Sequence, residues 1–205
     1  MNPPFKKLHT TLKEKLVDLE ITIPTPFQKN SIPIIKSGSD LYCIAPKDSG
    51  KTTTLILTTL HKLKCEVIGE SPRAIVLVKD DERGLELYNE FSKYIVFNTL
   101  RMYLGNEKLH IDTQKSEIFE GIDILIATSK TVHKLLLLNG LSTSQIKIFS
   151  IDDAEFLTKA DAYANLMGIT QSINKCQFVI YAEKMNPILD RLKSYFMDKS
   201  RIISI

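Results

Sequence analysis

Glycine is scarce in this chain: only 8 of the 205 residues are glycine, whereas an average globular chain contains about 7%. The shortage excludes collagen-like repeats and Gly/Ser linker chains, and it matters most where backbone must approach a ligand closely. Hydrophobic residues make up 43% of the chain and charged residues 25%. These proportions are typical of a folded globular protein and exclude low-complexity disorder.

Arginine and cysteine are also few. Only 5 of the 27 basic residues are arginine, which disfavours dense two-pronged recognition of phosphates. The net charge of +3 is too small to indicate a nucleic-acid binder. The three cysteines, Cys43, Cys65 and Cys176, lie far apart, and no Cys/His pair has the spacing of metal ligands. We expect Cys43 and Cys176 to be small core residues.

Long hydrophobic runs are missing as well. No apolar stretch approaches the 18 residues of a membrane span, and the N-terminus lacks the apolar segment of a signal peptide. We therefore expect no membrane partner and a reducing, cytoplasmic location.

What the chain does contain is a regular alternation of short apolar runs with segments of helical period. Strands are expected at residues 41–45, 74–78, 99–104, 123–127, 146–151, 177–182 and 201–205. Helices are expected at residues 5–19, 51–64, 132–138 and 187–196, and helical sequence follows the 146–151 strand up to about residue 173. Another helix is expected at a segment with Leu85, Tyr88, Phe91 and Ile95 on one face. Continuously apolar strands indicate burial on both faces. The pattern predicts one doubly wound α/β domain, with a mainly parallel central sheet flanked by helices and ligands at the carboxyl ends of its strands.

One such strand end carries a phosphate-loop pattern, Ala-x-x-x-x-Gly-Lys-Thr. Its residues are Ala45, Pro46, Lys47, Asp48, Ser49, Gly50, Lys51 and Thr52. In such a loop, backbone N–H groups at a helix N-terminus cradle phosphates, the lysine reaches the β and γ phosphates, and the hydroxyl ligates Mg²⁺. We therefore assign Lys51 a catalytic role and Thr52 a metal-binding role; the alternative is a plain turn between a strand and a helix.

A second candidate site follows the strand expected at 146–151. Asp152 is placed to complete a Mg²⁺ site, and Asp153 stands where a carboxylate that orients the attacking water belongs. The alternative is an acidic helix N-terminus, where carboxylates are favoured by the helix dipole.

Together these motifs resemble the first RecA-like domain of DEAD-box RNA helicases, a group of P-loop NTPases, over essentially the whole chain. Residues 24–28 resemble the Q motif, 78–83 motif Ia, 103–105 the paired glycines, 126–131 motif Ib, 152–155 the Asp-Glu-Ala-Asp motif and 181–183 the Ser-Ala-Thr motif. The resemblance implies a single domain over residues 1–205, in which 1–40 form an N-terminal helix and Q-motif-like region and 41–205 the P-loop core.

The resemblance also implies that Thr25 and Gln28 bind the nucleotide. A side-chain amide can pair with the N6 and N7 edge of adenine, so Gln28 would select ATP. The alternative is a glutamine that belongs only to a helix N-terminus and contacts solvent.

Several positions depart from the family pattern. Glu20, Asp48, Leu104 and Lys130 stand where the family commonly has glycine, and Asp153 is one methylene shorter than the usual glutamate. The nucleic-acid motifs have become acidic, Lys79-Asp80-Asp81-Glu82, or have lost their arginine, Ser129-Lys130-Thr131. Both hydroxyls of the Ser-Ala-Thr motif are replaced. Weak RNA binding follows as an expectation.

These observations lead to three hypotheses. The first is an ATP- and Mg-binding DEAD-box-type domain with little or no ATPase or unwinding activity of its own, because residues 1–205 contain no second helicase domain to supply arginines. Any ATP hydrolysis would then need such a domain or a partner. The second is a catalytically inactive pseudo-helicase that acts as a module for binding protein or RNA. Its partner would be a helicase or a ribonucleoprotein. The third, a small-molecule kinase, is disfavoured by residues 24–28.

Overall fold

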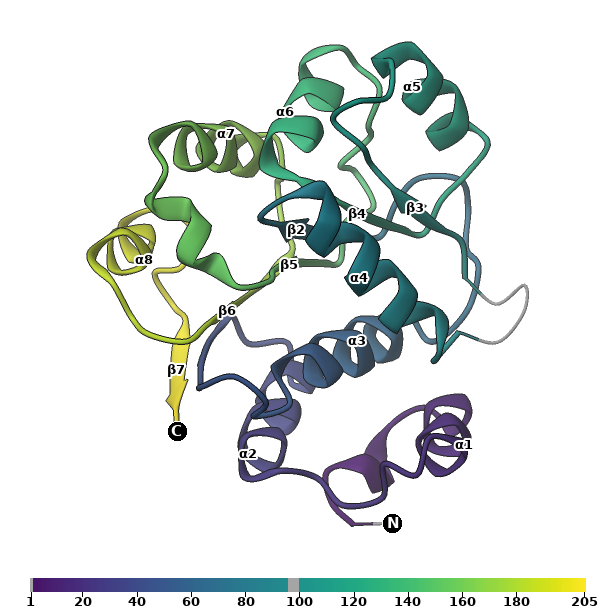
Figure 1. The fold of residues 1–205 in the computed structure, drawn as a ribbon, viewed down its shortest axis with the longest axis vertical. Helices are drawn as coiled ribbons and strands as arrows, with labels where there is room; N and C mark the ends of the chain where they lie inside the picture. The colour runs from purple at the N-terminus through teal and green to yellow at the C-terminus, as the bar shows by residue number, and fades with distance from the viewer. Residues whose placement is uncertain (1, 96–99) are drawn as a thin grey trace.

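The computed structural model describes residues 2–95 and 100–205 (Figure 1). The strands are β1 (Leu41–Ile44), β2 (Ala74–Val78), β3 (Met102–Leu104), β4 (Ile124–Thr128), β5 (Ile148–Ile151), β6 (Gln177–Ala182) and β7 (Arg201–Ser204). The α-helices are α1 (Thr10–Asp18), α2 (Pro26–Lys36), α3 (Lys51–Lys62), α4 (Asp81–Ser92), α5 (Ile111–Phe119), α6 (Ser129–Leu137), α7 (Ala160–Gln171) and α8 (Pro187–Arg191). Short 3₁₀ turns occupy Phe5–Lys7, Ala154–Thr158 and Leu192–Ser194.

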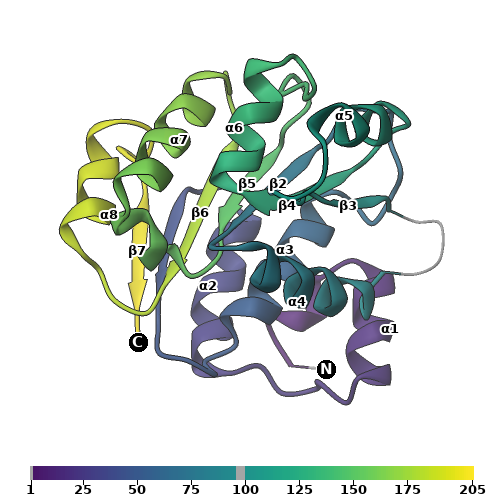
Figure 2. The same ribbon diagram turned by 45° about the horizontal axis from the view of Figure 1, so that its top comes forward.

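The strands form one sheet in the order β3-β4-β2-β5-β6-β1-β7, and neighbouring strands pair in parallel. Helices cover both faces: α1 to α4 lie on one side and α5 to α8 on the other (Figure 2). Alternate residues of β4 enter the two cores, Ile124 and Ile126 on one side and Leu125 and Ala127 on the other. The predicted doubly wound α/β architecture is therefore confirmed.

Four details of the predicted elements were wrong. The segment 5–19 is broken between a 3₁₀ turn and α1, because Leu8 and His9 have extended ψ angles of 167° and 146°. On α4 the buried face carries Leu87 and Phe91, while Leu85 is 52% exposed. Cys176 is only half-buried. The strand expected at 99–104 begins at Met102, and Thr99 lies outside the described residues.

Two helices, α2 and α5, were missing from the sequence prediction. The prolines at 24 and 26 suggested a break, but Pro26 occupies the first turn of α2, where no backbone N–H is needed. Among the described residues, every helix is too short or too polar to cross a membrane.

A buried ionic network ties the amino ends of three strands together. The Asp123 carboxylate, at the start of β4, accepts hydrogen bonds from Arg73 Nη2 at 2.6 Å and Arg101 Nε at 3.1 Å. It also accepts one from the Arg101 backbone N–H at 3.0 Å. Arg73 precedes β2 and Arg101 precedes β3, and both Asp123 and Arg73 are almost fully buried. The network therefore fixes these strands relative to one another.

We predict that Asp123→Asn lowers the free energy of unfolding by about 3–5 kcal/mol, because it leaves the buried Arg73 without its counter-charge. Urea denaturation checks this, with the exposed Asp198→Asn as the matched control. Desolvation acts to raise the pKa of the Asp123 carboxyl, but its bonds from Arg101 and Arg73 lower that pKa overall. The stabilisation should therefore be present at neutral pH and disappear as the pH falls through the folded-state pKa. Equal decreases in the free energy of unfolding for Asp123→Asn and Asp198→Asn would contradict the prediction.

Candidate functional site

The predicted site residues gather at the carboxyl edge of the sheet. The phosphate-loop segment follows β1, and Asp152 and Asp153 follow β5. The strand β2 pairs with β5 in parallel, Leu77 opposite Ile151, so the start of α4 also reaches this edge. An open cavity of about 470 Å³ lies there, lined by residues of the loop and of α3 together with Arg83 and Asp153.

The loop itself has a tightly determined backbone. Gly50 has φ +94°, and a Cβ at this position would lie 2.7 Å from Gln28 Nε2. Glycine is therefore required here both by backbone conformation and by the close approach of a neighbour. The Thr25 hydroxyl donates a 2.7 Å hydrogen bond to the carbonyl of Ser49. The Q-motif-like segment thus braces the loop from the side.

Lys51 is folded back onto this loop. The side chain is only 7% exposed, and its Nζ donates to the carbonyl oxygens of Ala45 at 2.6 Å and Pro46 at 2.8 Å. The Ser49 hydroxyl is buried and has no hydrogen-bond partner among the described residues. An ammonium group and an unpaired hydroxyl inside one loop are donors suited to an anion.

Gln28 lies at the base of the loop, not in an open pocket. It is 3% exposed and forms a capping box with Thr25, in which Gln28 Oε1 accepts from the Thr25 N–H at 2.9 Å. Its Nε2 donates to the carbonyl of Gly50 at 3.5 Å. Pairing with adenine requires the Gln28 amide to turn outward, so recognition of adenine by Gln28 stays a prediction.

The two acidic residues have different environments. Asp152 is 1% exposed, and its backbone N–H donates to the Leu77 carbonyl at 2.9 Å, which joins it to β2. Desolvation raises the pKa of the Asp152 carboxyl, and the bond from Arg83 partly offsets this. Asp153 has a left-handed backbone, φ 47° and ψ 61°, and lines the cavity.

Arg83, near the start of α4, was missed by the sequence prediction. Its Nε donates to Asp152 Oδ2 at 2.7 Å and its Nη2 to Thr52 Oγ1 at 3.3 Å. Its Nη1 contacts Glu86 Oε2, one helical turn away, at 3.0 Å. The signal available in the sequence was an arginine just after a strand, three residues before a glutamate, a spacing that pairs charges on a helix.

A metal ion is implied by the resemblance, and its two predicted ligands are chemically suitable, since a carboxylate and a hydroxyl are oxygen ligands that Mg²⁺ accepts. Both Asp152 and Thr52, however, are already bonded to the Arg83 guanidinium. A divalent ion and this side chain therefore compete for the same oxygen atoms.

The Asp-Glu-Ala-Asp-like segment also contacts the residues 181–183. Glu155 Oε1 accepts hydrogen bonds from the backbone N–H groups of Glu183 at 2.5 Å and Lys184 at 3.4 Å. The two segments thus remain joined although neither hydroxyl of a Ser-Ala-Thr sequence is present. This link was also not predicted, because a side-chain to backbone bond between segments 28 residues apart leaves no sequence pattern.

An acidic surface lies beside the site, around Glu107. The Glu107 carboxylate accepts from the Thr128 hydroxyl at 2.7 Å and pairs with Lys130 Nζ at 2.9 Å. The Glu107 N–H donates to Asp81 Oδ2 at 3.0 Å. The segments that occupy the places of motifs Ia and Ib are therefore tied to each other through Glu107.

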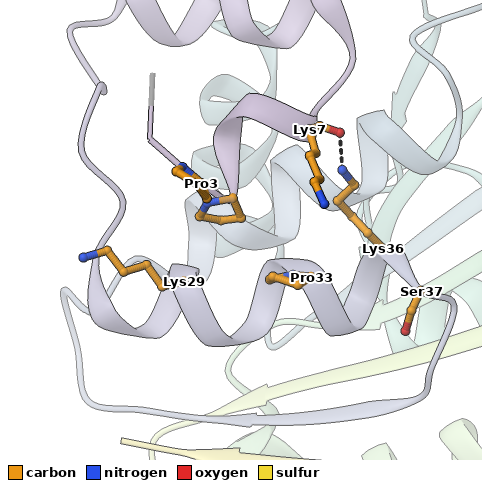
Figure 3. A pocket seen from close by; sticks show the side chains of 7 residues that line it. Pro3, Lys7, Lys29, Pro33, Lys36 and Ser37 are labelled. Atoms are coloured by element: carbon orange, nitrogen blue, oxygen red, sulfur yellow. Dashed lines mark hydrogen bonds between the residues drawn. The ribbon is translucent and has the colours of Figure 1, made fainter.

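A different cavity, of about 560 Å³, lies between α2 and the N-terminal segment. Figure 3 shows Lys29, Pro33 and Lys36 of α2 facing Pro3 and Lys7 of the N-terminal segment, with Lys36 Nζ bonded to the Lys7 carbonyl. Gln28 and the phosphate loop do not line it. This hollow is therefore separate from the predicted site.

Comparison with known proteins identifies the family. A family model described as DEAD/DEAH box helicase matches residues 25–183. The chain belongs to this family. A probable ATP-dependent RNA helicase, ddx42 of Dictyostelium discoideum, is 30% identical over 150 residues, which cover 70% of this chain and 15% of that protein. The DEAD-box resemblance found in the sequence is thereby confirmed.

Solved DEAD-box structures have the same fold as this domain. A DEAD box protein from Methanococcus jannaschii superposes with a TM-score of 0.88 at 17% identity, covering 97% of this chain and 54% of that one. S. cerevisiae Dbp5, solved with Nup159, Gle1, IP6 and ADP, gives 0.82 at 17% identity, covering 97% and 52%. The DEAD-box domain described here thus spans about half the length of these solved chains.

Proposed function

We propose that this DEAD-box domain binds ATP together with Mg²⁺ and has little or no ATPase or unwinding activity by itself. The observation that carries the proposal is the loop after β1, where Gly50 adopts a left-handed backbone and the donors of Lys51 and Ser49 are held in one place. Family membership and the 470 Å³ cavity beside the loop support it.

The residues divide the work of binding. Lys51 exchanges its bonds to Ala45 and Pro46 for phosphate oxygens, and the N–H groups at the start of α3 supply the remaining donors. Thr25 keeps the loop in place through the Ser49 carbonyl, and Gln28 selects adenine once its amide turns outward. Thr52 and Asp152 would hold the metal ion, which when bound screens the charge of the phosphates.

Slow hydrolysis follows from two features. Asp153 is a short side chain on a left-handed backbone, so its carboxylate is poorly placed to hold an attacking water, and small misplacements cost large factors in rate. An arginine from a second domain or a partner, worth about 10³–10⁵ in rate, is also required. Activity as an ATP hydrolase therefore depends on such a second component.

A second candidate function, an interaction module without catalysis, is favoured by the acidic surface around Glu107. Lys130 is paired with Glu107, and the neighbouring hollow of about 530 Å³ is lined by Asp80, Asp81, Glu82 and Glu107 together with Lys79 and Lys108. Four carboxylates against two lysines leave an excess of negative charge there, which disfavours RNA phosphates and suits a basic segment of a protein, such as a helicase or ribonucleoprotein component. The buried, unpaired cysteines Cys43 and Cys65 support a reducing location such as the cytoplasm.

The first test is calorimetric titration with ATP and Mg²⁺. We predict that Lys51→Ala weakens binding by about ten- to a hundredfold, because a hydrogen bond to a charged group contributes about 1.5–3 kcal/mol. Lys93→Ala, on the exposed end of α4, is the matched control and should bind as the unmodified chain does. Absence of binding to the unmodified chain at millimolar ATP would sink the proposal.

Asp48 gives a second prediction. It lies in the cavity with φ +59°, and two like charges about 4 Å apart repel by about 1 kcal/mol in water. Asp48→Gly should therefore tighten ATP binding about fivefold in the same titration. Asp48→Asn separates the two causes, because it removes the charge and keeps a side chain that tolerates this backbone. If only the glycine variant binds more tightly, backbone strain rather than charge is responsible.

RNA binding is tested by gel shift with a single-stranded RNA at two salt concentrations. We predict weak binding with a shallow salt dependence, because few phosphate contacts release few counterions. Glu107→Gln frees Lys130 and should tighten the complex, whereas Glu90→Gln, on the far end of α4, should not. Tight binding of the unmodified chain with a steep salt dependence would show that the acidic surface does not exclude RNA.

A further inference from the structure

We propose that the Arg83 guanidinium takes the place of a divalent cation in this site, so that the chain binds nucleotide phosphates with little dependence on a metal ion. This inference rests on the ATP binding proposed above and changes one part of it, the role of Mg²⁺. It concerns a residue of α4 to which no role had been assigned from the sequence.

The geometry places one positive charge between the two oxygen ligands. Arg83 Nε lies 2.7 Å from Asp152 Oδ2, and Nη2 lies 3.3 Å from Thr52 Oγ1. Asp152 follows β5 and Thr52 begins α3 after the loop, so the arginine bridges the two motifs from a third element. Asp152 and Thr52 are the residues that would hold a divalent cation, so Arg83 engages the same two side chains.

The guanidinium also faces the space that phosphates would fill. The side chain of Arg83 is 18% exposed and lines the cavity with Lys51 and Asp153. A guanidinium has five N–H groups, and three of them bond Asp152, Thr52 and Glu86. The two left over among the described contacts are suited to phosphate oxygens, which arginine binds in a two-pronged manner.

The arginine is held firmly in this place. Its backbone N–H donates to Oδ1 of Asp80, the N-cap residue of α4, at 2.8 Å. Glu86, one turn further along the helix, pairs with its Nη1. An arginine guanidinium is not deprotonated in proteins. The side chain therefore remains charged throughout the physiological range.

A magnesium ion would have to displace this side chain. Mg²⁺ requires a near-octahedral set of oxygen ligands and gives up its waters reluctantly. Coordination of a metal ion through Asp152 Oδ2 would break the buried bond from Arg83 Nε and would place two cations side by side. The Arg83 guanidinium is thus favoured over an exchangeable Mg²⁺ ion as the cation at this site.

The test is calorimetric titration of the full chain with ATP, once in Mg²⁺ and once in excess EDTA. We expect the two dissociation constants of the unmodified chain to agree within about threefold. In Arg83→Leu, binding in EDTA should weaken more than about tenfold while Mg²⁺ restores much of it, because a charge-assisted contact is lost and the metal ligands are freed. Arg83→Lys, which keeps the charge without the planar fork, should lie between them.

The outcomes separate this inference from the proposed function. If the unmodified chain binds ATP in Mg²⁺ but more than about tenfold more weakly in EDTA, the inference is overturned and ATP binding stands. If it binds ATP in neither condition, both fall. The comparison within the unmodified chain does not depend on the variants folding. Mn²⁺ added without nucleotide and followed by electron paramagnetic resonance gives a second readout, with bound Mn²⁺ expected for Arg83→Leu and not for the unmodified chain.

Discussion

The parallel pairing of β2 with β5 is the constraint on which the site depends. Leu77 lies opposite Ile151, and the next residue, Asp152, donates its N–H to the Leu77 carbonyl. This fixes the distance between the end of β5 and the beginning of α4, where Arg83 is located. The bond between Arg83 and Asp152 is therefore a consequence of strand register, since a slip of one residue would turn the two side chains away from each other.

Much of the site could be predicted because its parts are local in sequence. A buried strand, Gly50-Lys51-Thr52 and a helix follow one another directly, and so do the strand β5 and its two aspartates. The fold followed from apolar runs of strand length alternating with helical periods. The roles of these residues toward ATP and Mg²⁺ stay predictions, whereas the family to which the loop and the aspartates belong is confirmed.

What could not be predicted depends on contacts between distant segments. Arg83 and Asp152 are 69 residues apart, and Glu155 reaches backbone groups 28 and 29 residues further on; neither pair shares a motif. Two positions where the family commonly has glycine, Glu20 and Asp48, keep positive φ angles of 58° and 59°. The backbone at both positions adopts the left-handed conformation that favours glycine although neither residue is glycine, and the sequence alone shows only the loss of glycine.

The ionic network around Asp123 lies at the opposite edge of the sheet from the phosphate loop, and different kinds of interaction hold the two edges. At the amino edge, the buried Asp123 and Arg73 and the partly exposed Arg101 join the starts of three strands. At the carboxyl edge, the loop, the Gln28 amide and Lys51 are held by exchangeable hydrogen bonds to backbone carbonyls. A ligand can therefore rearrange the hydrogen bonds of the phosphate loop without disturbing the ion pairs that hold the strands together at the amino edge.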